Sequence, residues 1–475
     1  MKHYRNHFEK IEKIKSGEIS LRENVNYFLK RIEENSNLNC YNFVFKESIE
    51  HADIIEEKIK NNQAGKLAGM VIAIKDVLAL KDKPMTCSSN ILRNFISIYT
   101  STAVQKLINE DAIIIGKTNC DEFAMGSSNE NSAFGPVLNP HDTSRVSGGS
   151  SGGSAVAVAA DLCDVSLGTD TGGSIRQPAA FCGIYGLKPT YGRVSRYGLT
   201  AFASSFDTIG PFANSIEDIA LVLEVISGKD EKDSTSQNLA VPEFSKNIFT
   251  DKKFKIGIPN EYFGEGLDIE IKNAINNEIE KLKSNGHQII EITLPHTEYA
   301  IATYYILTTA EASSNLSRYE GAHYGFRAEQ AGDLIDMYTE TRTQGFGKEV
   351  KRRIMLGTYV LSAGYYDAYY RKAQKVRRLL KNDFNEAFKN VDVILTPTTP
   401  TVAFRIGEKS SDPLEMYLSD IYTTSANLAG IPGINIPIAK NKDGMPIGMQ
   451  LMANQFEELK LIQLAKVIES LKEEK

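Results

Sequence analysis

The spacing of hydrophobic residues changes along the chain, and near the N-terminus it follows the period of a helix. Apolar side chains between Val25 and Ile32 recur three or four positions apart. Ser20 and Glu23 stand before them in a capping-box pattern, which is typical of a helix start. Residues 1–65 are therefore predicted to form a helical segment that packs on the rest of the protein.

After residue 65, short apolar runs alternate with helical patterns, which cover 269–282 and 348–388. Six runs have the length of buried strands: Ala68–Ile74, Ala112–Ile115, Phe254–Ile258, Gln288–Ile292, Val391–Leu395 and Ile434–Ile438. This alternation predicts an α/β fold, with a mixed twisted β-sheet covered by helices on both faces. Because no repeat is visible, residues 66–475 are expected to form one domain. The polar stretch 227–240 is predicted to be a loop within it.

Composition narrows the class of protein. The chain has 475 residues, of which 42% are hydrophobic and 24% are charged, as in a folded globular protein. Its net charge of −6 argues against a strong grip on nucleic acid, and no apolar run reaches the roughly 18 residues of a membrane span. There is no signal-peptide pattern at the start, and the five cysteines form no C-x-x-C pair. A cytoplasmic protein without a metal site is expected.

Glycine and serine are concentrated between residues 147 and 189. They crowd two loops, 147–154 and 168–174, and the small apolar residues between the loops predict a buried helix followed by a short strand. A flexible Gly/Ser linker would not alternate with such apolar segments. The region is therefore interpreted as a pair of loops held inside a core.

Two formal motif matches in the chain fail on their context. Residues 148–152 satisfy G-x-S-x-G, but no strand precedes them as a nucleophile elbow requires. Gly116-Lys117-Thr118 resembles the end of a P-loop, yet Asp111 stands where the first glycine is needed. The seven histidines are scattered and none has the context of a Ser-His-Asp triad. A serine enzyme here would need another base.

Lys75 and Ser174 are the candidates for catalysis from the residues alone. Lys75 directly follows a predicted buried strand, and burial lowers the pKa of a lysine, so a neutral amine could serve as base. The alternative is a lysine that emerges into solvent. Ser174 follows two glycines, whose unobstructed N–H groups suit an oxyanion hole. The alternative for this loop is an ordinary turn.

Taken together, these pieces resemble the amidase signature family. The resemblance rests on Ile74-Lys75-Asp76, on the loop GGSSGG at 148–153, and on DTGGSIRQPA at 170–179, with separations like those of the family. It implies an amidase-signature fold and a Ser-Ser-Lys triad, in which Ser174 is the nucleophile, Ser150 relays the proton and Lys75 is the base. It further implies a cis peptide at Ser150, an oxyanion hole from the N–H groups of Thr171, Gly172 and Gly173, and support from Ser151.

Within the family, segments along nearly the whole chain resemble the glutaminase subunits of tRNA-dependent amidotransferases; they include 117–140, 190–212, 311–321 and 352–370. This resemblance implies that glutamine is hydrolysed and that ammonia passes to a partner, which converts Glu-tRNA(Gln) to Gln-tRNA(Gln). The partners would be the B and C subunits of a heterotrimer, with ATP and Mg²⁺ used at a partner and no cofactor on this chain. Arg353 would bind the α-carboxylate of glutamine, Asp420 its α-ammonium, and Tyr304 would add a hydrogen bond.

Other interpretations stay open at this point. Arg353 could be a surface cation and Asp420 a carboxylate at a helix end. A stand-alone amidase of the same family would use the same triad on small amides and need no partner. A non-catalytic protein could use the glycine loops to bind an anion. The sequence does not decide between glutamine and asparagine as donor, or whether Asp-tRNA(Asn) is also amidated.

Overall fold

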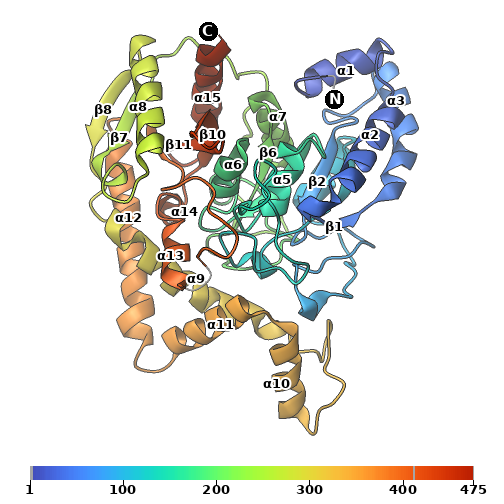
Figure 1. Cartoon of the computed structure of the whole chain (residues 1–475), viewed down its shortest axis with the longest axis vertical. Helices are drawn as coiled ribbons and strands as arrows, with labels where there is room; N and C mark the ends of the chain where they lie inside the picture. Colours follow the sequence, from blue (N-terminus) through green and yellow to red (C-terminus); the bar gives the residue numbers. More distant parts are fainter. Residues whose placement is uncertain (1–3, 410–411, 474–475) are drawn as a thin grey trace.

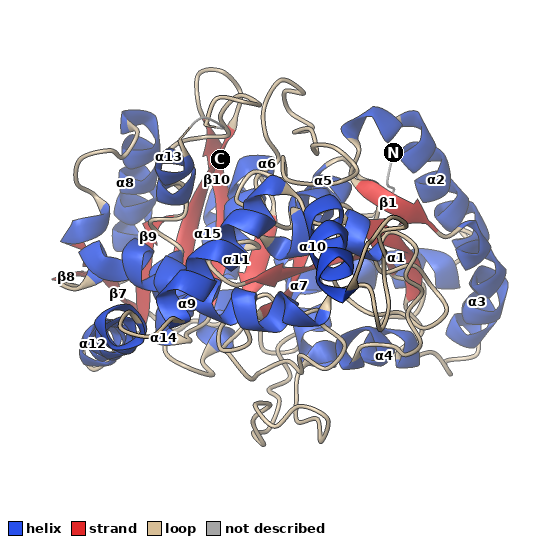
Figure 2. Ribbon diagram, turned by 90° about the horizontal axis from the view of Figure 1, so that it is seen from below, coloured by secondary structure: helices blue, strands red, loops and turns tan. Residues whose placement is uncertain are grey.

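The computed structural model describes residues 4–409 and 412–473, and its centre is one mixed β-sheet with helices on both faces (Figures 1 and 2). The strand order is β1-β3-β2-β4-β6-β5-β10-β11-β9-β7-β8. The strands are β1 (Tyr41–Val44), β2 (Val71–Lys75), β3 (Ile113–Thr118), β4 (Val165–Asp170), β5 (Tyr185–Lys188), β6 (Thr208–Ala213), β7 (Lys255–Pro259), β8 (Gln288–Ile292), β9 (Val393–Pro397), β10 (Gly433–Lys440) and β11 (Pro446–Ala453). The predicted fold class is confirmed, and all six predicted strands are present.

The helices cover the sheet in two layers, with the N-terminal and C-terminal helices at the upper end of the view in Figure 1. The α-helices are α1 (His7–Lys15), α2 (Leu21–Glu34), α3 (Ala52–Lys60), α4 (Thr102–Asn109), α5 (Gly152–Ala159), α6 (Arg176–Cys182), α7 (Ile216–Ile226), α8 (Ile269–Ser284), α9 (Ala300–Asn315), α10 (Leu334–Gly345), α11 (Lys348–Leu361), α12 (Lys372–Ala387), α13 (Pro413–Leu418), α14 (Thr424–Ala429) and α15 (Glu458–Glu473). No helix of the described chain is long and apolar enough to cross a bilayer.

Strand β2 is buried on both faces, which explains why its apolar run is continuous rather than alternating. Val71 and Ala73 point into the cluster formed with α2, α3 and α5, whereas Ile72 and Ile74 point into the larger cluster on the opposite face. Successive side chains of a strand face opposite sides, so a strand covered on both faces must be apolar at every position. The same burial carries Lys75, the last residue of β2, into the interior.

The N-terminal segment was predicted to be helical, but it also contains a strand, β1. Strand β1 pairs antiparallel with β3 and forms one edge of the sheet. Its four residues are all half-buried, so they carry no alternating pattern that could reveal a strand. The predicted cap is present, since Ser20 accepts a hydrogen bond from the Glu23 N–H at 3.5 Å. Helices α1 to α3 pack on the sheet, while a domain boundary at residue 65 stays a prediction.

Two further segments singled out in the sequence are the polar stretch at 227–240 and the long helical pattern at 348–388. Residues 228–240 of the polar stretch contain no helix or strand. The pattern at 348–388 does not form one continuous helix. It divides into α11, a π-helical stretch η8 (Tyr366–Arg371) and α12. Gly364 lies between them with a φ of +86°, a conformation that favours glycine and ends a helix.

Candidate active site

Lys75 is completely buried and surrounded by hydroxyl groups. Its Nζ donates to Ser150 Oγ at 2.7 Å, to Ser151 Oγ at 2.9 Å and to Thr169 Oγ1 at 2.9 Å. Burial lowers its pKa to about 8, because the interior destabilises the cation. A lysine exposed to solvent is excluded, and the lowered pKa makes the neutral amine far more accessible near neutral pH than in an ordinary lysine, so Lys75 is suitable as a base.

The loop that carries Ser150 is folded tightly between the sheet and α5. The peptide bond between Gly149 and Ser150 is cis, as the family resemblance implied. Gly149 has no room for a side chain, because a Cβ there would overlap the Asp121 carboxylate. Ser151 directly precedes α5, and its hydroxyl also donates to the Thr169 carbonyl at 3.0 Å. The predicted supporting serine therefore ties this loop to β4 and holds Lys75.

Ser174 lies on the loop between β4 and α6, and it is half-buried, whereas Lys75 and Ser150 are fully buried. This greater exposure suits a nucleophile that must meet substrate. Of the three N–H groups predicted to form an oxyanion hole, that of Gly173 donates to Asp170 Oδ1 at 2.9 Å. Those of Thr171 and Gly172 donate to no other group in the described chain. Two N–H groups thus remain for an oxyanion in this structure.

The two glycines before Ser174 are required by close neighbours. A Cβ on Gly172 would lie 2.5 Å from the Tyr304 hydroxyl, and Gly173 has a φ of +137° with the Thr423 side chain against it. The Thr423 hydroxyl donates to the Gly172 carbonyl at 2.6 Å. That bond satisfies the Gly172 carbonyl and fixes the orientation of its peptide group.

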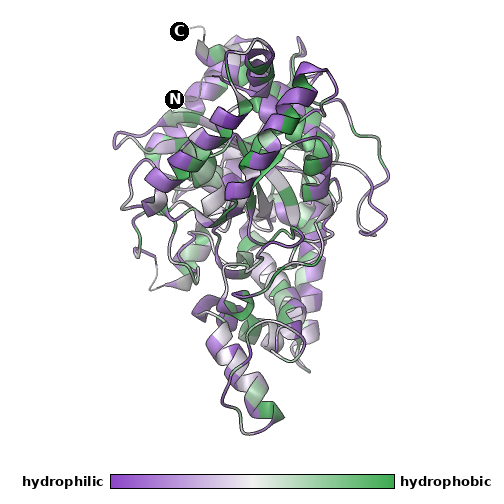
Figure 3. Ribbon diagram, turned by 90° about the vertical axis from the view of Figure 1, so that its right-hand side faces the viewer, coloured by the Kyte–Doolittle hydropathy of each residue, from purple (hydrophilic) through white to green (hydrophobic). Residues whose placement is uncertain are grey.

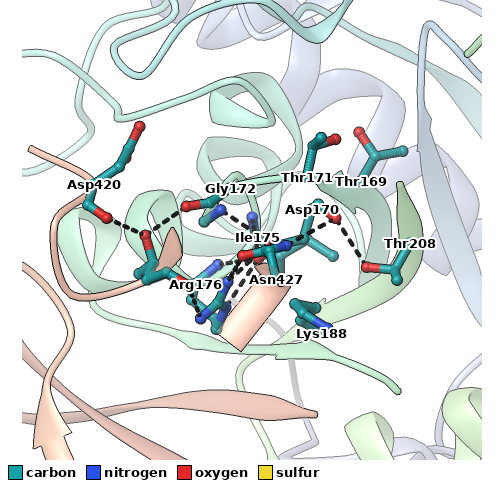
Figure 4. A network of polar contacts seen from close by, with 12 residues as sticks. Thr169, Asp170, Thr171, Gly172, Ile175, Arg176, Lys188, Thr208, Asp420 and Asn427 are labelled. Atoms are coloured by element: carbon teal, nitrogen blue, oxygen red, sulfur yellow. Dashed lines mark hydrogen bonds and ion pairs between the residues drawn. The ribbon is translucent and has the colours of Figure 1, made fainter. Parts of the chain in front are cut away.

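An ion pair beneath the loop fixes its shape, and sequence reasoning did not single it out (Figure 4). Arg176 donates to Asp170 through Nε at 3.1 Å and Nη2 at 3.0 Å, and both side chains are fully buried. Burial alone would raise the pKa of Asp170, but the Arg176 charge and hydrogen bonds hold it at about 2. The remaining Arg176 N–H groups donate to the Thr423 carbonyl, Asn427 Oδ1 and Gln450 Oε1.

Arg353 is buried on the inner face of α11 rather than exposed as a surface cation. Its Nε donates to Glu349 Oε1 at 2.8 Å, and this carboxylate holds the pKa of Arg353 above its usual range although burial acts to lower it. Three aromatic rings lie within 6 Å of the guanidinium: Phe202, Tyr305 and Tyr417. The terminal Nη groups have no hydrogen-bond partner in the described chain, so they are available for a carboxylate.

Asp420 is also buried, and one of its oxygens is unpaired. Ser127 donates its hydroxyl to Oδ2, while Oδ1 has no partner in the described residues. Burial raises the pKa of Asp420 to about 7, although the Ser127 hydroxyl and the positive charge of Arg353 act to lower it. An unpaired buried carboxylate oxygen is costly unless a ligand cation meets it. Sequence reasoning missed Ser127, which has no motif of its own.

A cavity of about 280 Å³ opens beside Arg353. Its lining is mostly polar and charged; it includes Lys348, Glu349, Arg352 and Arg353 of α11 together with Glu130, Lys409 and Tyr417. The volume suits a small molecule such as an amino acid rather than a long acyl chain. In the described chain no cluster of His, Cys, Asp and Glu could hold a metal ion.

Comparison with known proteins places the chain in a family. The family model described as Amidase matches residues 23–462. The chain belongs to the amidase family. The family resemblance inferred from the sequence is thereby confirmed.

Several amidase-family relatives match almost the whole chain. The A subunit of the glutamyl-tRNA(Gln) amidotransferase of Koribacter versatilis is 56% identical over 93% of each chain, and the protein of the same name in Prosthecochloris aestuarii is 52% identical over 97% of each. The crystal structure of the A subunit of the Thermotoga maritima amidotransferase shares 38% identity with a TM-score of 0.79, covering 96% of this chain and 93% of that one. The peptide amidase of Stenotrophomonas maltophilia shares 27% identity, with a TM-score of 0.80 and coverage of 97% and 96%.

Proposed function

We propose that this amidase-family protein is the glutaminase subunit of a tRNA-dependent amidotransferase, and that it supplies ammonia for the conversion of Glu-tRNA(Gln) to Gln-tRNA(Gln). The observation that carries the proposal is the pair of buried, half-satisfied charges near the catalytic loop. Arg353 offers free guanidinium N–H groups and Asp420 an unpaired oxygen. Free glutamine has the complementary α-carboxylate and α-ammonium. The names of the curated relatives agree with this substrate.

The reaction would begin with the transfer of a proton from Ser174 to neutral Lys75 through the Ser150 hydroxyl, which lies 2.7 Å from Nζ. Ser174 Oγ would attack the amide carbon of glutamine. The negative oxygen that forms would be held by the N–H groups of Thr171 and Gly172. Lys75 would return the proton through Ser150 to the leaving nitrogen, so ammonia departs and a γ-glutamyl ester remains on Ser174.

Water would then resolve the ester by the same route. Lys75 would accept a proton of the attacking water through Ser150, and would return it to Ser174 Oγ as glutamate leaves. One water is consumed, and one glutamate and one ammonia are released per cycle. Tyr304, whose hydroxyl lies against Gly172, would contribute a hydrogen bond beside the reacting amide.

The remaining parts of the reaction belong to partners in this proposal. The B and C subunits would complete a cytoplasmic heterotrimer, and Glu-tRNA(Gln), ATP and Mg²⁺ would be bound mainly by a partner. The net charge of −6 supports this division, since it gives this chain little attraction for polyanionic tRNA. No cofactor on this chain is needed for the serine chemistry described above.

The test uses the chain recovered with its native partners. The assembly would receive glutamine, ATP, Mg²⁺ and Glu-tRNA(Gln), and Gln-tRNA(Gln) formation would be followed. Ser174→Ala should abolish glutamine-dependent product and glutamate release, while added ammonia should still support product. Substantial glutamine hydrolysis by Ser174→Ala would contradict the nucleophile assignment. A lone chain that hydrolyses simple amides, with no partner and no tRNA product, would indicate a stand-alone amidase instead.

A further inference from the structure

Exposed hydrophobic side chains are frequent on α11 and in η8. With α10 and the start of α12, these elements lie at the lower end of the molecule in Figure 1, and the ribbon in Figure 3 shows hydrophobic and hydrophilic residues side by side at that end. Met355 is 72% exposed, Leu356 44% and Tyr359 47%, all on α11. Further exposed members follow in and before η8: Leu361, Tyr365, Tyr366 and Tyr369. Single exposed apolar residues are common, but a contiguous group of this kind marks an interaction surface.

The aromatic members of the group contact one another. The ring centroids of Tyr359 and Tyr365 are 4.2 Å apart, and both rings lie about 6 Å from that of Tyr369, at 6.3 Å and 6.0 Å. Met355 and Leu356 precede Tyr359 by one helical turn, so they share its side of α11. We call these five residues the tyrosine face. Tyrosine and methionine with few carboxylates is the composition of protein–protein interface cores.

Three exposed cations follow the tyrosine face closely in the chain. Lys372, Lys375 and Arg378 are exposed on the first turns of α12 and form no ion pair in the described chain. Arg371 differs, because it pairs with Asp367 at 3.0 Å. In a chain with a net charge of −6, three unpaired cations in seven residues would attract carboxylates on a partner.

The buried side of α11 belongs to the proposed glutamine site. Arg353 is buried there, and Gly357 is packed so tightly on α9 that a Cβ would overlap the Thr309 carbonyl. Helix α9 carries Tyr304. The tyrosine face and Arg353 thus lie on the same helix, which is closely packed on the helix that carries Tyr304.

We propose that the tyrosine face is the docking surface for the B–C subunit pair of the amidotransferase, through a partner surface that is apolar and edged by carboxylates. The proposal rests on the proposed function. A protein partner fits better than RNA because the five residues of the face are apolar or aromatic, whereas binding to phosphates relies on cations, and the unpaired cations belong to α12 rather than to the face itself. Docking here places the partner on the helix that holds Arg353.

The test measures binding of the purified, tagged chain to the co-expressed B–C pair from the same host, without tRNA. Tyr359→Glu puts a charge in the centre of the tyrosine face, and Ile269→Glu is the matched control, at a 64% exposed position on α8. Circular dichroism and urea midpoints would establish that both variants are folded. Tyr359→Glu should weaken binding at least tenfold and Ile269→Glu should not. Charge reversal of Lys375 and Arg378 should weaken binding more at low than at high salt.

The possible outcomes distinguish a failure of the docking surface from a failure of the proposed amidotransferase function. Wild-type affinity of Tyr359→Glu for the B–C pair would overturn the docking surface. So would an assembly that forms normally but requires more Glu-tRNA, since that result would assign the face to RNA. If the wild-type chain itself bound no B–C pair, both the docking surface and the proposed amidotransferase function would fail. Glutamate release by the lone chain should be equal in the wild type and Tyr359→Glu.

Discussion

Asp420→Asn tests the recognition of glutamine without changing the shape of the site. The asparagine side chain can still accept the Ser127 hydrogen bond with its oxygen, but an NH₂ group replaces an acceptor. Where the carboxylate oxygen now stands unpaired, the variant has no negative charge to offer an α-ammonium. The decrease in kcat/KM should therefore affect only substrates that carry this ammonium.

The expected magnitude follows from the burial of the pair. A hydrogen bond to a charged group contributes about 1.5–3 kcal/mol, and leaving the ammonium without its partner in a buried site places the loss at about 2–3 kcal/mol. That corresponds to a decrease of roughly 30- to 150-fold in kcat/KM for glutamine. The matched substrate is glutaramate, which has the amide and the carboxylate of glutamine but lacks the ammonium. Its kcat/KM should change less than about threefold, or less than about 0.7 kcal/mol.

The pH dependence provides an internal check. Because burial raises the pKa of Asp420 to about 7, only about one in ten of these carboxylates is ionised at pH 6. The ratio of kcat/KM for glutamine to that for glutaramate should fall as the pH drops through 7, since Lys75 acts on both substrates and cancels. In Asp420→Asn the ratio should be flat. An equal loss on both substrates, or an unchanged ratio with pH in the wild type, would refute the role of Asp420.

Three further predictions concern the base, the carboxylate clamp and the buried ion pair. The kcat for glutamine should rise with pH along a titration curve whose midpoint lies near 8, because Lys75 would act as a neutral base with a pKa of about 8. A midpoint near 10 would contradict the lowered pKa of Lys75. Arg353→Ala should raise the glutamine KM and spare ammonia-dependent Gln-tRNA synthesis by the assembly; equal loss with both donors would indicate a structural role. Arg176→Gln should lower the free energy of unfolding by about 3–5 kcal/mol in urea melts, since it leaves Asp170 charged and unpaired, and adding Asp170→Asn should restore part of it.

The strands that the sequence revealed are those with dense apolar runs. Five others escaped or were seen only in part, for physical reasons that differ from strand to strand. Strand β6 contains Gly210 and Pro211, and β5 has four residues including Gly186, so neither has the β-branched run of a buried strand. Strand β4 was predicted as a short strand after a helix, but it continues into the second glycine loop as far as Asp170.

Some residues of the candidate site could be predicted from the sequence and others could not. Lys75, Ser150 and Ser174 could be predicted because each lies in a local motif, and the structure brings Lys75 and Ser150 into direct contact. Ser127 could not, because its role depends on Asp420, which is 293 residues further along the chain. Contacts of this separation are set by sheet order and leave no spacing in the sequence.

The network around Arg176 has a consequence for the order in which the protein becomes active during synthesis. Arg176 and Asp170 lie in the first half of the chain, but their hydrogen-bond partners Asn427 and Gln450 are made close to its end. A ribosome must therefore complete nearly the whole polypeptide before the nucleophile loop is held in place. The incomplete nascent chain has the serines and the lysine but lacks the groups that fix the loop around them, so the loop can take its final shape only when the chain is nearly finished.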